Sequence, residues 1–134
     1  MIASKIGAAL KARLASLTFT PALPVAWPNR DFVPDGDHLS AAINRIPNER
    51  LGVQAMHRIG GTLVVTVVTA VGKGSGEGDG KADAVAAHFP ADLSLPLTGG
   101  GHVRIIAAPS VREGFADGGY WRTPVTIPFE VITT

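Results

Sequence analysis

One run of residues limits the fold of this chain more than any other. Between positions 62 and 69 the sequence reads Thr-Leu-Val-Val-Thr-Val-Val-Thr, which is β-branched almost throughout. Side chains that branch at Cβ favour the extended backbone of a strand. Both faces of this strand are apolar or Thr, which is typical of a central strand that is covered on both sides. The fold should therefore contain a sheet, with this run near its middle.

The last part of the chain predicts a second long strand. From position 121 to 131 the odd-numbered residues are Trp, Thr, Val, Ile, Phe and Val, and the even-numbered ones are Arg, Pro, Thr, Pro and Glu. This alternation predicts one buried face and one outward face. Pro124 and Pro128 are four residues apart, so their missing N–H groups lie on the same lateral side of the strand. Because proline is nearly confined to unpaired edges of a sheet, we expect an edge strand here, or a bulge beside an edge.

Shorter strands are expected on both sides of these two, within residues 38–71 and 103–133. Residues 39–44 alternate and predict a short strand, and 47–50 predict a turn. The stretch 51–59 is ambiguous; one interpretation is a strand with Val53 and Ala55 facing inward. Further on, 103–108 predict a strand. A turn over 114–119 is expected to join the strand-forming pairs 111–112 and 120–121 into a hairpin.

Two helices complete the set of predicted elements. Residues 2–17 carry one apolar stripe at spacings of three and four, which predicts a helix that docks on the sheet. The Lys and Arg residues beside the stripe are too few for a helix that binds a membrane surface. The second helix is predicted over 80–89 and ends at Pro90, after a glycine-rich loop over 72–80.

Residues 20–37 are expected to form an extended, proline-rich arm. Pro24, Pro28 and Pro34 restrict the backbone and remove hydrogen-bond donors, so regular structure is excluded over this stretch. Trp27 and Phe32 are its largest side chains. An arm this apolar must pack on something, and two alternatives stay open: its own domain, with Trp27 filling the core, or a neighbouring subunit.

The sequence predicts no catalytic, metal or cofactor site. The chain has no Cys, and its His residues are too scattered to suggest a zinc site. Ser75 does not lie in a Gly-x-Ser-x-Gly motif. The loop over 72–80 has the context of a phosphate-binding loop but the wrong register, because Lys73 is followed by Gly rather than Ser or Thr. Glu77 and Asp79 add negative charge where a phosphate would bind.

Composition supports one domain over residues 1–134 and argues against two classes of partner. A net charge of +1 gives no electrostatic basis for specific nucleic-acid binding. Apolar runs are too short to span a membrane, and Lys5, Lys11 and Arg13 interrupt the N-terminal stretch where a signal peptide would need an apolar core. The order of elements predicts an α+β fold: a mostly antiparallel, mixed sheet packed by an N-terminal and an internal helix, with the extended arm.

The order and spacing of four features resemble the tail terminator-like family of long-tailed bacteriophages. The features are the Ala-Trp-Pro-Asn arm after one N-terminal helix, the apolar strand over 61–71, the glycine-rich loop that leads into an Ala-rich helix, and the closing segment over 119–129. The resemblance spans nearly the whole chain. It implies a structural virion protein, located at the head-proximal end of the phage tail and assembled in the host cytoplasm, rather than an enzyme.

The resemblance also implies partners. Proteins of this type are expected to form rings, here a hexamer of this chain, that cap the tail tube, end its polymerisation and provide the surface for head joining. The partners would be other copies of the chain, the major tail tube protein and head–tail connector or neck proteins, and DNA would pass through the ring. The candidate contact residues are Trp27, Pro28, Asn29, Phe32, Lys73, Ser75, Glu77 and Asp79.

Two other functions stay open from the sequence. A neck or tail-completion protein that joins head and tail would share the size and the ring-forming behaviour. A small ligand-binding or hydrolytic domain would use the loop from Gly72 to Gly80.

Overall fold

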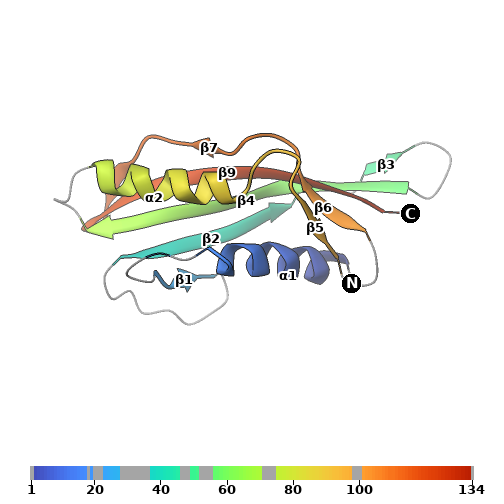
Figure 1. Cartoon of the computed structure of the whole chain (residues 1–134), viewed down its shortest axis with the longest axis horizontal. Coiled ribbons are helices and arrows are strands. Elements are labelled where there is room, and N and C mark those ends of the chain that lie inside the picture. Colours follow the sequence, from blue (N-terminus) through green and yellow to red (C-terminus); the bar gives the residue numbers. More distant parts are fainter. Residues whose placement is uncertain are drawn as a thin grey trace.

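The computed structural model describes residues 2–17, 19, 23–27, 37–45, 49–51, 56–70, 75–97 and 101–133. Two helices, α1 (Ile2–Ala15) and α2 (Ser75–His88), pack against one sheet (Figure 1). The strands of this sheet are β1 (Val25–Ala26), β2 (His38–Arg45), β3 (Glu49–Leu51), β4 (Met56–Ala70), β5 (Ser94–Pro96), β6 (His102–Ile105), β7 (Ser110–Val111), β8 (Phe115–Asp117) and β9 (Tyr120–Thr133). The α+β class predicted from the sequence is confirmed.

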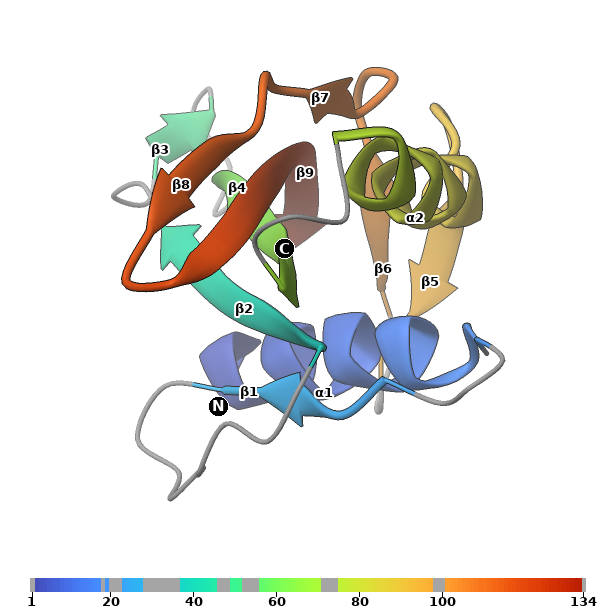
Figure 2. The ribbon, with the colours of Figure 1, turned by 90° about the vertical axis from the view of Figure 1, so that its left-hand side faces the viewer.

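The sheet is mixed and mostly antiparallel, in the order β1-β2-β4-β9-β6-β5. The pairing of β1 with β2 is parallel, and the other pairings are antiparallel. Because β1 lies within the proline-rich arm, the expectation that regular structure is excluded there is wrong for Val25–Ala26, where the backbone pairs with β2 between the prolines. The two long strands predicted from sequence, β4 and β9, pair with each other from His57↔Thr133 to Ala70↔Tyr120. The sheet curls around the two helices, which lie on the same side of β2, β4 and β9 (Figure 2).

The core lies between the helices and the odd-numbered face of β2, β4 and β9. In register, Leu39 pairs with Val67 and Val65 with Val125, so these side chains share one face. They form one buried cluster with the stripe of α1 (Ile6, Leu10, Leu14), with α2 (Ala82, Val85, Phe89) and with Val103 and Ile105 of β6. The stripe predicted for the first helix and the inward face predicted for the last strand are both confirmed.

The prediction that the last strand lies at an edge is wrong. β9 pairs with β4 along one side and with β8, β7 and β6 along the other. The prolines explain why the second side is divided among three short strands. The carbonyl of Pro124 accepts a hydrogen bond from Arg112 N and that of Pro128 from Ile106 N, so both residues direct their backbone to this side. Because proline has no N–H group, neither residue can donate a hydrogen bond to a partner strand on this side. The pairing on this side of β9 is therefore interrupted at both prolines.

The expectation that β4 is covered on both faces is wrong in part. Its odd-numbered residues Leu63, Val65 and Val67 are buried under the helices. On the other face Val68 is buried but Val64 and Thr66 are partly exposed. Among the described residues, both helices pack on the first face, so the second face has no helical cover.

The second helix begins earlier than predicted. α2 starts at Ser75, so residues 75–80 are helical rather than part of a loop, while 71–74 lie outside the described residues. The packing of Gly78 gives the physical reason. A Cβ atom at Gly78 would lie 2.7 Å from Thr123 Oγ1, so only glycine lets the helix approach β9 this closely. This tertiary contact outweighs the low helix propensity of glycine.

Some local boundaries also differ from the predictions. Glu49 and Arg50, expected in a turn, belong to β3, which pairs with the start of β4. Residues 52–55, with the proposed inward Val53 and Ala55, lie outside the described residues. The strand expected over 103–108 ends at Ile105.

The predicted pairing of 111–112 with 120–121 is wrong, because Val111 pairs with Val125 and residues 115–117 take the place opposite residues 120–122. The hairpin that forms is tighter than predicted. Its turn is Gly118–Gly119, between β8 and β9, where the φ angles are +59° and +85°. Positive φ at both central residues is the requirement of a type I′ hairpin turn, and glycine meets it without strain. The remaining residues of the expected turn, 115–117, extend the hairpin as β8.

Candidate functional site

Of the predicted contact residues on the arm, the structure describes Trp27. It follows β1, whose Val25 pairs with Leu39, and its side chain is half-buried against the core cluster. Lys11 Nζ of α1 lies 5.2 Å from the centre of the indole ring, which is within the range of a cation–π interaction. Trp27 therefore contacts its own subunit and keeps part of its surface exposed. Pro28, Asn29 and Phe32 lie outside the described residues.

The predicted contact residues of the glycine-rich segment are separated by the start of α2. Lys73 lies outside the described residues, as do the side chains of Ser75 and Glu77. Asp79 is exposed on α2. Because residues 75–80 are helical, they do not form the flexible loop on which the ligand-binding alternative rested. The structure does not bring these residues into one described site with Trp27.

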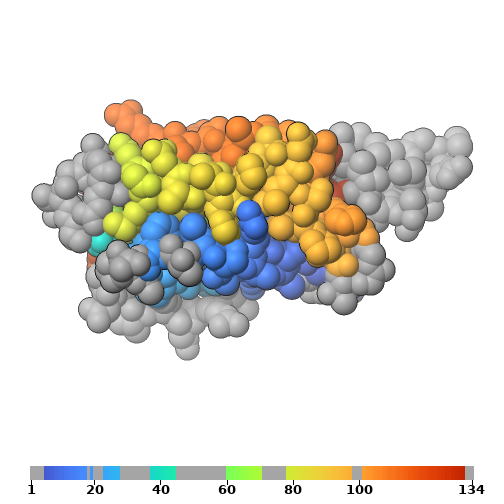
Figure 3. All heavy atoms as spheres, viewed as in Figure 1, coloured from blue at the N-terminus to red at the C-terminus, as the bar shows by residue number. Residues whose placement is uncertain are grey.

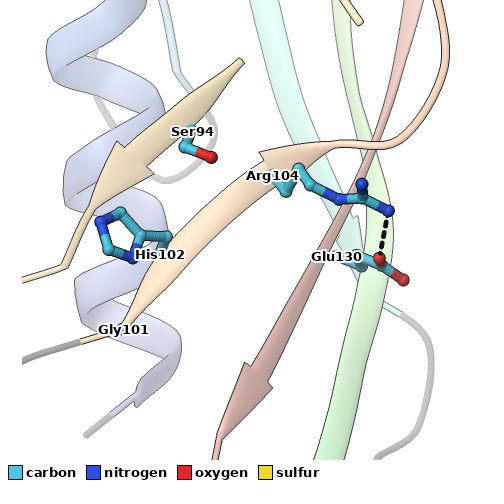
Figure 4. Close-up of a pocket in the computed structure, with 5 residues that line it drawn as sticks. All are labelled: Ser94, Gly101, His102, Arg104 and Glu130. Atoms are coloured by element: carbon cyan, nitrogen blue, oxygen red, sulfur yellow. Dashed lines mark hydrogen bonds and ion pairs between the residues drawn. The ribbon is translucent and has the colours of Figure 1, made fainter. Parts of the chain in front are cut away.

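A polar pocket of about 310 Å³ lies beside β5, β6 and β9. It is lined by Ser94, Gly101, His102, Arg104 and Glu130 (Figure 4). Arg104 donates to Glu130 Oε1 at 2.9 Å and to Asp92 Oδ1 at 3.3 Å. The guanidinium is therefore already shared between two carboxylates. These ion pairs link β6 to β9 and to the turn that precedes β5, and they leave little free positive charge for an anionic ligand.

The described residues contain no group of three or more His, Asp or Glu side chains that could hold a metal ion. Within the same residues, no helix is both long and apolar enough to cross a bilayer.

The carboxyl ends of the two helices exchange hydrogen bonds. Figure 3 shows the blue surface of α1 adjoining the yellow surface of α2 on this side of the molecule. Arg13 Nε donates to the carbonyl of His88 at 2.9 Å, and His88 Nε2 lies 2.9 Å from the carbonyl of Arg13. Ser16 Oγ lies 2.7 Å from the same His88 nitrogen. The His88 carbonyl at the end of α2 thereby gains a donor, and the Arg13 carbonyl accepts from Ser16 as well. The pKa of His88 is lowered from its ordinary value of 6.5, mainly because the ring is partly buried. The hydrogen bond to the Arg13 carbonyl raises the pKa, and the positive charge of Arg13 lowers it.

The surface without helical cover is the part of the molecule that most resembles a contact site. We define the outer face as the even-numbered residues of 40–44, 62–66 and 124–128, which point away from the helices on β2, β4 and β9. These are Ser, Thr, Ala, Asn, Val and Pro, with no charged residue among them. They are half-buried, except Asn44, which is exposed.

Two exposed apolar side chains border the outer face beyond β9. Phe115 pairs with Arg122, whose side chain lies on the outer side of β9. The side chain of Phe115 is 48% exposed. Ile106 follows the buried Ile105, and 44% of its surface is exposed. The outer face and these two residues are absent from the contact residues predicted from sequence. The alternation over 121–131 did contain a signal, because its outward positions between Arg122 and Glu130 are uncharged.

One of the comparisons with known proteins identifies a family. The family model described as "Phage tail terminator protein" matches residues 5–129. A solved structure that carries only a sequence identifier as its name is 30% identical, with a TM-score of 0.77, over 96% of this chain and 94% of that chain. A search of the curated proteins finds no match. The match to the family model covers nearly the whole chain, including both helices and the described strands up to most of β9. The chain therefore belongs to the phage tail terminator family and is a structural component of a phage tail.

Proposed function

We propose that this protein forms a ring, hexameric by the family resemblance, that caps the tail tube at the head-proximal end. The ring would stop further tube polymerisation and provide the surface to which the head joins. The observation that carries the proposal is the match of the tail terminator family model to residues 5–129. The partners would be other copies of the chain, the major tail tube protein and head–tail connector or neck proteins, with DNA passing through the ring.

A ring is suited physically to this task. A closed cyclic array matches a tube built of stacked rings and makes many equivalent contacts at once, so that individually weak contacts hold it firmly. Because the fold carries an uncharged outer face with exposed Phe115 and Ile106 beside it, it offers a surface for protein contacts. Assembly would take place in the host cytoplasm before head joining.

The proposal is tested in a phage that lacks this gene. We expect tails without a cap at the head-proximal end, some of them over-long, and few tails joined to heads. Negative-stain microscopy measures tail length and joining, and addition of the purified protein to the uncapped tails should restore joining. Tails of normal length that join heads normally would exclude the terminator function and favour a neck protein instead.

A further inference from the structure

The outer face is unusual because it lacks charge. Charged residues make up about 25% of an average globular domain and 17% of this chain. The nine outer-face residues on three adjacent strands include none, and Pro124, Pro128, Val64 and Ala42 are apolar. Among the described residues the core lies on the opposite side under the helices, and the outer-face residues are at most half-buried, so packing in that core does not account for this composition.

Ion pairs at both ends of the outer face compensate the charges that border it. At one end Arg104 pairs with Glu130 at 2.9 Å, in the register row next to Pro128. At the other end Arg122 Nε lies 3.1 Å from Asp117 Oδ2. Arg112 is exposed at the rim beyond β9. An uncharged centre with a charged, partly paired rim is the pattern of a protein–protein interface.

The size of the patch indicates what kind of contact it can make. The patch is four strands wide, counting the segment with Ile106 and Phe115, and neighbouring strands lie about 4.8 Å apart. With a length of about 20 Å along the strands, the patch has an area of about 400 Å². A stable pair of proteins buries about 800 Å² on each partner. The patch is therefore about half of what an isolated dimer needs, but sufficient for one contact among several in a closed ring.

We infer that the outer face, with Ile106 and Phe115, binds the neighbouring copy of this chain. This inference rests on the proposed ring. The absence of charge disfavours a charged partner such as DNA, and the small area favours a partner that is held by ring closure as well. A ring of more than two copies is built from two different patches on each subunit, so the outer face meets a different surface of the next copy.

The experiment places one charge at the centre of the outer face. Thr126 lies between Ser110 and Val64 in the register, and Thr126→Glu would bring an unpaired carboxylate into the contact. Thr126→Val is the matched control, because it keeps the shape and the branching at Cβ. A second variant, Ile106→Ser with Phe115→Ser, removes the exposed apolar side chains without a change in the core. Mass photometry measures the ring population, circular dichroism the melting of the monomer, and microscopy the capping of tails.

We expect Thr126→Glu to lower the ring population at least tenfold with monomer melting unchanged, the double serine variant to lower it less, and Thr126→Val to assemble as wild type. Rings at wild-type levels in Thr126→Glu would overturn the inference, as would loss of rings in Thr126→Val. If Thr126→Glu does not fold, the ring population of the double serine variant tests the inference: a reduced population supports it, and a wild-type population overturns it. Rings that form but fail to cap tails would assign the face to the tube instead. Wild-type protein that neither forms rings nor caps tails would exclude the proposed function itself.

Discussion

The backbone of Gly114 lies directly against the indole ring of Trp121. A Cβ atom at position 114 would come within 2.7 Å of Trp121 Cε2, where a real Cβ atom does not fit. The indole Nε1 is buried beside it and has no hydrogen-bond partner among the residues that the structure describes. The same ring also lies beside Gly78 of α2, where a Cβ atom would be 3.4 Å from Cδ1. Trp121 thus packs closely against two glycines that are far apart in the sequence.

Gly114→Ala should destabilise the protein, because the methyl group must displace the indole ring or the β7–β8 connection. Overpacking of this kind costs about 1–3 kcal/mol. The measurement is the free energy of unfolding in urea. The control repeats Gly114→Ala in a Trp121→Phe background, where the smaller ring makes room and the unpaired N–H is gone. An equal loss in both backgrounds would show that the contact with Trp121 is not the cause.

Two glycines of α2 make a matched pair for a second prediction. Gly78 faces Thr123 and Trp121, whereas a Cβ atom at Gly80 would meet nothing within 4 Å. Gly80→Ala should therefore stabilise the protein by about 1 kcal/mol, the difference in helix propensity. Gly78→Ala gains the same propensity but clashes with the fully buried Thr123, and should destabilise. Thermal melting of the two variants compares them, and the prediction is wrong if both raise the melting temperature.

The start of α2 shows why part of this fold could not be predicted from sequence. Local composition over 72–80 indicates a loop, and the contact that makes 75–80 helical comes from Thr123 and Trp121, more than 40 residues later. The prolines of β9 show a partial success. Their spacing correctly predicted that the two missing N–H groups lie on the same lateral side, but the pattern could not show that short strands pair between and beside the prolines on that side.

The candidate surface was less predictable than the fold. The alternation over 121–131 distinguished the inward from the outward face of β9. It could not show that β2 and β4 add uncharged residues in the same register rows, because strand pairing brings together positions as distant as Ser40 and Pro124. Ile106 and Phe115 lie in short segments whose exposure depends on that pairing, so no local pattern marks them.

Stability should fall in mild acid because of His88. Its pKa is lowered in the folded protein, mainly by burial, so the folded state binds protons more weakly than the unfolded chain. This contribution is fully present above the unfolded value of 6.5 and is lost as the pH falls through the lower folded value. The positive charge of Arg13 beside the His88 ring also disfavours protonation of that ring.

The measurement is the free energy of unfolding at pH 8 and at pH 5, for wild type and for His88→Gln. The Gln side chain cannot be protonated and can still donate to the Arg13 carbonyl. Wild type should lose more stability than His88→Gln between the two pH values, while the other three His residues contribute equally to both proteins. An identical loss in the two proteins would contradict the assignment to His88.

Trp27 gives the last prediction, which separates a role in the monomer from one between subunits. Its ring is half-buried on the core and lies under Lys11 Nζ, so Trp27→Ala should reduce monomer stability by about 1–2 kcal/mol through lost apolar burial. Lys11→Gln is the control for the cation–π contact alone, which is worth about 0.5–1 kcal/mol at an exposed site. Monomer melting and ring population are measured together. If rings weaken while monomer melting is unchanged, the exposed part of Trp27 anchors a neighbouring subunit, and the arm acts between copies rather than within one.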